Sequence, residues 1–275
     1  MSDGIAQDGE MRKSLLIPFV LSCLPSAGYS QPGDDLASVT VLPGWREADG
    51  THVAALRIDL ADGWKTYWRA PGDGGIPPNF AIAGSGVIAV QPHFPVPEVY
   101  ETFGIRSIGY ENSVTFPLRL QVGDAGEPVG ISGQIEIGVC EEVCIPVTLD
   151  FAAMLPPQGA SDPAILAALR DRPLTRTEAQ VGTVTCKVTP ISDGLQVATV
   201  ITMRATAADE VVVIEAGDPQ VWVSEPHVTR QGNQLTAVVD MVHISGQPFA
   251  LDRSALRFTV LGDGKAVDIQ GCTAH

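Results

Sequence analysis

Turn-forming residues interrupt this sequence too often for a fold built on long helices. The chain has 28 glycines and 21 prolines among 275 residues, about half again their usual share. Because glycine and proline end regular elements and favour turns, this composition favours many short strands and disfavours a helical bundle. The length suits two domains with a real hydrophobic core.

Short segments rich in β-branched residues, separated by turns, run from about residue 36 to residue 154 and resume at about residue 181. This spacing is typical of all-β domains. The sequence therefore predicts two β-sandwiches in series, over residues 31–155 and 178–275.

One short helix is expected between the two sandwiches. Ser161 or Asp162 can cap it, and Pro163 suits its first position. Pro173 ends the helical pattern. Residues 156–177 are therefore predicted to be a helical linker.

The charge balance excludes a class of partners. The chain has 17 Lys and Arg residues against 32 Asp and Glu residues, for a net charge of −15. Nucleic-acid binding requires clustered cations that displace counterions from phosphates, so a nucleic-acid partner is excluded. Adhesion to an anionic membrane surface is disfavoured for the same reason.

The first 30 residues have the layout of a secretory signal peptide. A basic stretch begins at Met11, which is a candidate for the true start, and is followed by an apolar run and then small residues up to Ser30. The run has about ten residues, and a membrane span needs about twenty. Lipidation of Cys23 is an alternative. We expect an exported chain, soluble or lipid-tethered, with no transmembrane segment after processing.

Export leaves four cysteines, Cys140, Cys144, Cys186 and Cys272, in an oxidising compartment that favours disulfides. On one straight strand, Cys140 and Cys144 would lie roughly 13 Å apart between Cα atoms, beyond the reach of a disulfide. Strand-like sequence flanks both residues, so we expect a tight hairpin that brings them together.

The chain-entropy model separates the two expected bridges. Closing the short ring between Cys140 and Cys144 contributes only about 2 kcal/mol, whereas bridging Cys186 to Cys272 closes about 87 residues and contributes about 4.6 kcal/mol. Strained or exposed bridges are the ones that exchange. We therefore interpret Cys140–Cys144 as the redox pair and Cys186–Cys272 as a structural disulfide.

Two other interpretations of the short pair stay open. The bridge could be an inert staple of the hairpin, or two thiolates plus a histidine could hold copper(I) or zinc. The histidines considered, His93, His227, His243 and His275, are scattered and none has ligand spacing to the pair. No metal or cofactor is assigned.

Glu141 and Glu142 lie between the two cysteines. Negative charge beside a sulfur raises the pKa of a thiol and disfavours the thiolate. The pair is therefore better suited to be attacked by a partner than to initiate attack.

An aromatic motif precedes the cysteines. If residues 64–68 form a strand, Trp64 and Trp68 share one face, which we expect to fill the core. Lys65, Tyr67 and Arg69 then share the opposite face, which we expect to point outward.

Four segments resemble the N-terminal periplasmic region of the DsbD/ScsB family of thiol:disulfide interchange proteins. They are residues 63–78 (GWKTYWRAPGDGGIPP), 105–110 (IRSIGY), 138–146 (GVCEEVCIP) and 267–272 (VDIQGC). The resemblance covers the chain from about residue 36 to its end.

This resemblance implies an immunoglobulin-like domain with a redox cysteine pair, at Cys140 and Cys144. In the family, such a domain receives electrons from a thioredoxin-like domain, fed by a membrane domain, and passes them to periplasmic disulfide-bearing proteins. It would act as a protein-disulfide reductase without a cofactor. A mobile cap loop with an aromatic residue shields the cysteines in the family, and Phe103 is the corresponding candidate.

The chain departs from the DsbD pattern in two respects. The DsbD pair is spaced more widely, so the CxxxC spacing fits the ScsB-like branch better. Full-length family members continue into membrane and thioredoxin-like domains. Either these parts are separate polypeptides here, or the chain binds something else with the same scaffold. The alternative function is a non-catalytic binding or assembly module, possibly copper-related, in which both disulfides are structural.

Overall fold

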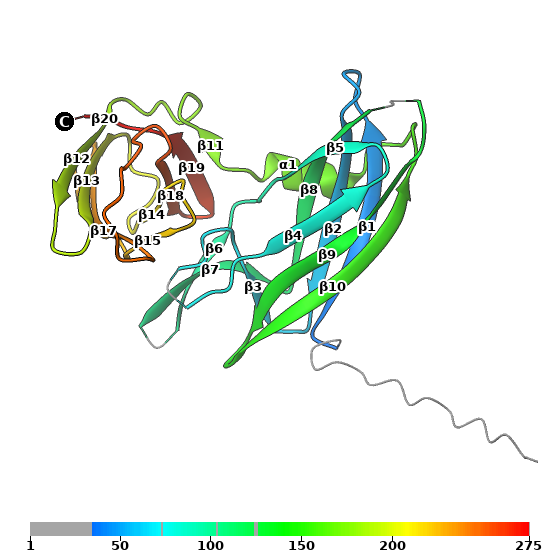
Figure 1. The fold of residues 1–275 in the computed structure, drawn as a ribbon, viewed down its shortest axis with the longest axis horizontal. Coiled ribbons are helices and arrows are strands. Elements are labelled where there is room, and N and C mark those ends of the chain that lie inside the picture. Colours follow the sequence, from blue (N-terminus) through cyan, green and yellow to red (C-terminus); the bar gives the residue numbers. More distant parts are fainter. Residues whose placement is uncertain (1–34, 73, 103, 124–125, 275) are drawn as a thin grey trace, which may run out of the picture. The chain divides into compact units, whose positions relative to one another are not determined.

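The computed structural model describes residues 35–72, 74–102, 104–123 and 126–274. Regular structure in these residues is almost entirely β, arranged in four sheets with one short helix (Figure 1). The prediction of an all-β fold is confirmed. The expected signal peptide, with Met11 and Cys23, lies outside the described residues.

The first sandwich consists of two antiparallel sheets. One has the strand order β1-β2-β8-β5, formed by β1 (Ala37–Arg46), β2 (His52–Leu60), β8 (Ser113–Val122) and β5 (Val87–Pro92). The other has the order β10-β9-β3-β7-β6, formed by β10 (Cys144–Leu155), β9 (Val129–Cys140), β3 (Lys65–Tyr67), β7 (Ile105–Glu111) and β6 (Glu98–Thr102), with β4 (Asn79–Gly84) also paired to β9. Trp68 and Phe116 are fully buried in the core.

The second sandwich also has two sheets. One has the order β11-β19-β18-β14, formed by β11 (Leu174–Thr175), β19 (Lys265–Gln270), β18 (Arg257–Gly262) and β14 (Val211–Glu215). The other has the order β15-β17-β13-β12-β20, formed by β15 (Val221–Val223), β17 (Gln234–His243), β13 (Leu195–Thr202), β12 (Val184–Pro190) and β20 (Thr273–Ala274), with β16 (His227–Gln231) also paired to β17. Alternate residues of these strands fill one apolar core.

Helix α1 (Pro163–Arg170) lies in the segment predicted to contain it. The Asp162 carboxylate accepts hydrogen bonds from the backbone N–H groups of Ala164 and Ile165, at 2.7 and 3.3 Å, as an N-cap should. Ile165 is fully buried against Val53 and Ala55 of β2. No helix in the described residues is long and apolar enough to cross a bilayer.

The second sandwich contributes side chains to the core of the first. Leu261 and Ala266 are buried in the same apolar cluster as Ile108 and Tyr110 of β7, and residues 32–275 form one compact unit. The outer face of the β11-β19-β18-β14 sheet is therefore covered rather than solvated. The sequence predicted the two sandwiches but not this shared core.

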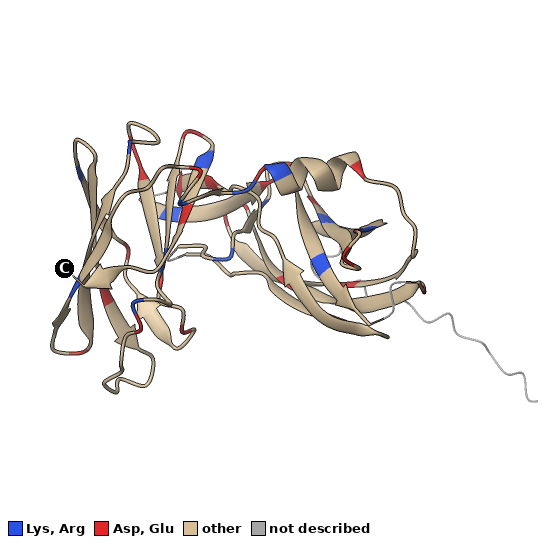
Figure 2. Cartoon of the chain, turned by 90° about the horizontal axis from the view of Figure 1, so that it is seen from above, with Lys and Arg blue, Asp and Glu red and all other residues tan. Residues whose placement is uncertain are grey.

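Charged residues are dispersed over the described chain. Figure 2 shows Lys and Arg positions interspersed with Asp and Glu positions along the strands and loops, without a continuous basic stripe in this view.

The buried histidine of β2 predicts a pH-dependent stability. His52 is fully buried, with Nε2 2.6 Å from the Pro43 carbonyl oxygen and Nδ1 3.2 Å from Arg46 Nε. The carbonyl can only accept, so Nε2–H donates to Pro43 and Nδ1 accepts from Arg46, and the ring is neutral. Burial is the main cause that lowers the pKa of His52 below 6.5.

The unfolded chain therefore binds this proton first on acidification. The contribution of neutral His52 to the free energy of unfolding is complete above about pH 6.5. Below that pH it decreases, by at most about 1.4 kcal/mol per pH unit for one proton. Urea unfolding between pH 7.5 and 5.5 should show a smaller pH dependence for His52→Gln than for the unmodified chain. Equal pH dependences would contradict this account.

Candidate functional site

A disulfide closes the tip of the β9–β10 hairpin. Cys140 is the last residue of β9 and Cys144 the first of β10, and the two face each other in the strand register. Their Cα atoms are 4.2 Å apart and their sulfurs are bonded. Below the tip, buried residues alternate with more exposed ones along β10, which fixes the register.

The two cysteines differ in exposure. Cys140 is 7% exposed, whereas Cys144 is an exposed residue. The difference follows from the sheet order, because β3 pairs with the Cys140 end of β9 while β10 is an edge strand. An incoming protein can therefore approach Cys144 far more easily than Cys140.

Tyr67 touches both sulfurs. Its hydroxyl oxygen lies 3.0 Å from the Sγ atom of Cys140 and 3.0 Å from that of Cys144. Burial raises the pKa of Tyr67, so the hydroxyl stays protonated and can donate a hydrogen bond to either sulfur. The expectation that Tyr67 faces outward is wrong, since this side chain is buried.

Two glycines make room for the Tyr67 ring. A Cβ atom at Gly75 would lie 2.8 Å from the ring, and one at Gly138 would lie 3.1 Å from it. A Cβ at Gly138 would also meet the Cβ of Ile76 at 2.8 Å. The loop after β3 therefore packs over the tyrosine, and the glycines allow this close approach.

Lys65 and Arg69 are also held by specific partners. The Lys65 ammonium lies 4.5 Å from the centre of the Tyr100 ring, a cation–π contact. Arg69 forms an ion pair with Glu215 of β14, so its expected outward orientation is wrong too. Among the described residues, no Lys, Arg or His side chain donates a hydrogen bond to either sulfur of the short disulfide.

The surroundings of the exposed cysteine are apolar and acidic. Val143 in the hairpin loop is 69% exposed, and Glu141 and Glu142 of the same loop are exposed. Ile105, at the start of β7, is 56% exposed and lies near Gly74, in the loop that packs over Tyr67. Phe103, the candidate shield, lies outside the described residues, between the ends of β6 and β7.

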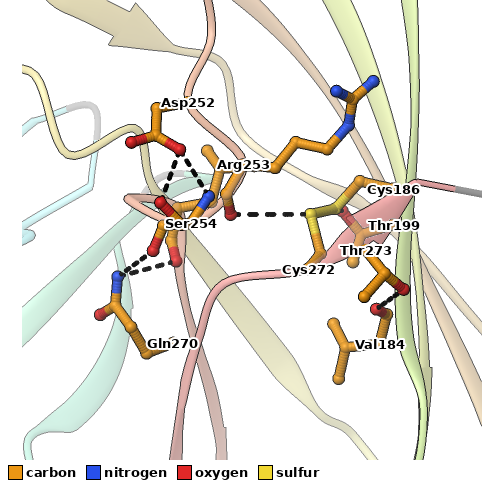
Figure 3. Close-up of a disulfide and its surroundings, with 10 residues drawn as sticks. Val184, Cys186, Thr199, Asp252, Arg253, Ser254, Gln270, Cys272 and Thr273 are labelled. Carbon is orange, nitrogen blue, oxygen red and sulfur yellow. Dashed lines mark hydrogen bonds between the residues drawn. A yellow bond between two sulfur atoms is a disulfide. The ribbon is translucent and has the colours of Figure 1, made fainter.

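Cys186 and Cys272 form the second disulfide, with Cα atoms 5.8 Å apart (Figure 3). Cys186 is 1% exposed and its sulfur lies 3.4 Å from the hydroxyl of Thr199. The bond links β12 to the chain just before β20. Cys272 is half-buried, so neither cysteine of this pair is exposed as Cys144 is.

The histidines considered as metal ligands do not gather at the cysteines. Within the described ranges, no group of three His, Cys, Asp or Glu side chains is placed to hold a metal ion. His275 lies outside these ranges.

Sequence reasoning missed the Tyr67 contact. The residue was assigned to the outward face because it alternates with Trp64 and Trp68. Alternation identifies the two faces of a strand but does not show that a loop covers the second face. The glycines of that loop, at residues 74–75, are the only signal that could have suggested a close contact.

Comparison with known proteins assigns the first sandwich to a family. Residues 38–156 match the model of the N-terminal region of the thiol:disulfide interchange protein DsbD. No curated protein matches the sequence.

Two solved structures are similar to the chain. The N-terminal periplasmic domain of ScsB from Proteus mirabilis is 25% identical, with a TM-score of 0.67, over 90% of this chain and 96% of that one. The reduced N-terminal domain of DsbD from Neisseria meningitidis is 19% identical over 48% of this chain and 92% of that one. Its TM-score of 0.27 is too low to support an argument.

Proposed function

Residues 38–156 form an N-terminal domain of the DsbD/ScsB type, and from this premise we propose that the chain is a periplasmic thiol–disulfide exchange protein. It relays electrons through Cys140 and Cys144, from a thioredoxin-like or membrane redox protein to periplasmic proteins with disulfides. The observation that carries the proposal is a disulfide with one exposed and one buried cysteine at a hairpin tip.

The exposure of the cysteines sets the order of bond changes. A thiolate of the reduced partner attacks Sγ of Cys144, and the sulfur–sulfur bond to Cys140 breaks. Cys140 leaves as a thiolate next to the Tyr67 hydroxyl, which donates a hydrogen bond to it. The partner's second thiol then attacks the mixed disulfide, so the partner is oxidised and both cysteines of this chain are reduced.

The second half of the cycle returns the electrons. The Cys144 thiolate attacks a disulfide of the substrate protein and forms a new mixed disulfide, releasing one substrate thiol. Cys140 then attacks Sγ of Cys144 and releases the second substrate thiol, which restores the original bond. Two electrons and two protons pass from partner to substrate in each cycle, and no cofactor takes part.

The acidic residues of the hairpin loop favour a reaction that takes place only when a partner protein is docked. Glu141 and Glu142 are exposed beside the sulfurs, and negative charge disfavours a free thiolate. Glu141 and Glu142 therefore oppose formation of the thiolate, whereas the Tyr67 hydroxyl, 3.0 Å from both sulfurs, favours it. Exposed Val143 and Ile105 offer apolar contact area to a docking protein, whose own charges can then favour the thiolate.

A redox titration tests the proposal. We expect glutathione buffers to reduce Cys140–Cys144 while Cys186–Cys272 stays closed, because exposed bridges exchange and buried ones resist reduction. Alkylation of free thiols followed by mass spectrometry of peptides reports each pair separately, so the second disulfide is the internal control.

The result also decides between the two functions considered. A short pair that stays oxidised below about −300 mV would behave as a structural bridge. That outcome would overturn the relay and favour a non-catalytic binding or assembly module.

A further inference from the structure

We propose that Glu215 of the second sandwich is a positioning residue for the Cys140–Cys144 site, acting through Arg69 and Tyr67. This inference rests on the proposed function for its biological meaning. Its physical basis is an ion pair that anchors the end of β3, the strand that carries Tyr67.

Arg69 is anchored by three groups. Its Nε and Nη2 atoms lie 3.0–3.2 Å from the two carboxylate oxygens of Glu215. Nη2 also donates to the hydroxyl of Thr259 at 3.1 Å, and the guanidinium carbon lies 3.8 Å from the centre of the Trp68 ring. A two-pronged pair of this kind fixes direction as well as distance.

The anchor is poorly accessible to water. The Arg69 side chain is 13% exposed and that of Glu215 is 26% exposed, and Thr259 is fully buried. Burial of Arg69 lowers its pKa, and Glu215 opposes this effect. A buried cation that loses its counter-charge is strongly disfavoured, so without Glu215 the Arg69 side chain should move toward water.

A displacement of Arg69 would shift Tyr67, whose hydroxyl contacts both sulfurs. Tyr67 is the last residue of β3, a strand of only three residues, and Arg69 follows it by two residues. The loop after Arg69 packs Gly75 against the Tyr67 ring. Arg69 is thus the junction between the strand and the loop that together hold the tyrosine.

Displacement of Tyr67 has a defined chemical consequence. Its hydroxyl can donate a hydrogen bond to the disulfide or to the thiolate that replaces it, and bonds to charged acceptors are the stronger ones. Loss of this contact therefore disfavours the reduced state more than the oxidised state. The pair should become harder to reduce, and its reduction should slow.

The test uses Glu215→Gln, which keeps the size of the side chain but removes its charge. The matched control is Asp268→Asn, because Asp268 pairs with Arg257 on the same sheet face and has no hydrogen bond to Arg69 among the described residues. Tyr67→Phe and the double variant Tyr67→Phe/Glu215→Gln complete the set. The readouts are the equilibrium constant of Cys140–Cys144 with glutathione and its rate of reduction.

We expect Tyr67→Phe to shift the equilibrium about tenfold toward the disulfide and Glu215→Gln to shift it about three- to tenfold. Asp268→Asn should change it less than about twofold, because the Asp268 carboxylate bonds to Arg257 and acts on Arg69 only through space. In the Tyr67→Phe background, Glu215→Gln should have no further effect, because its action passes through the tyrosine.

The inference is overturned if Glu215→Gln has no effect, if Asp268→Asn has an equal effect, or if the effect persists without the Tyr67 hydroxyl. Should Glu215→Gln not fold, Thr259→Val weakens the same anchor and should shift the equilibrium in the same direction. The glutathione test needs no protein partner and therefore tests the role of Glu215 separately from the relay. If the variants respond to glutathione as expected but the chain does not exchange with thioredoxin-like proteins, the relay is rejected and the role of Glu215 stands.

Discussion

Cys140→Ser should trap a partner protein as a mixed disulfide, and Cys144→Ser should not. In Cys140→Ser the remaining thiol belongs to the exposed Cys144, and no neighbouring cysteine can resolve the bond that it forms. In Cys144→Ser the remaining thiol belongs to Cys140, which is 7% exposed, pairs with Lys65 of β3 and contacts the Tyr67 hydroxyl. We expect at least about a 100-fold lower rate of mixed-disulfide formation for this variant.

A suitable probe is a thioredoxin-like protein whose second active-site cysteine is replaced by serine and whose first is held as a mixed disulfide with thionitrobenzoate. The Cys144 thiolate then attacks the probe sulfur and thionitrobenzoate leaves, with non-reducing electrophoresis and mass spectrometry as the readout. Both single variants should lose the complete exchange reaction, since each lacks one of the two sulfurs. The double variant Cys140→Ser/Cys144→Ser controls for reaction at the second disulfide. Equal trapping by the two single variants, or faster trapping by Cys144→Ser, would mean that exposure does not set the order of attack.

Local patterns carried most of the information about the fold. Turn residues and alternating apolar residues predicted the two sandwiches, and Asp162 with Pro163 predicted helix α1, because each of these signals acts within a few residues. The pairing of Cys140 with Cys144 across a hairpin follows from the length of chain between them. These features depend on the neighbouring sequence and not on how distant parts of the chain pack.

The shared core and the environment of Tyr67 depend on distant parts of the chain. One face of β3 packs on the core of the first sandwich, and the loop that follows the strand covers the other face. Alternation separates the two faces of a strand, but here neither face points to solvent. The same alternation predicts an outward Arg69, yet its partner Glu215 lies 146 residues further along the chain. A single sequence contains no signal that links two such positions.

Removal of the Cys186–Cys272 disulfide should destabilise the chain far more than removal of the short one. The bridge joins residues separated by 86 positions (Figure 3), and the chain-entropy model gives about 4.6 kcal/mol for such a loop, against about 2 kcal/mol for the hairpin ring. Replacing Cys186 also removes a fully packed side chain beside Thr199. We therefore expect Cys186→Ala/Cys272→Ala to lower the free energy of unfolding by about 4 kcal/mol.

The matched comparison is Cys140→Ala/Cys144→Ala, with urea unfolding of both double variants at 25 °C and pH 7.5 followed by circular dichroism. The variant without the long bridge should still exchange at Cys140–Cys144 in the folded state, because β9, β10 and Tyr67 belong to the first sandwich. This result would assign a structural role to Cys186–Cys272 and a redox role to Cys140–Cys144. If the hairpin variant loses more stability than the other, the roles of the two bridges are reversed, since the short ring would be the structural one.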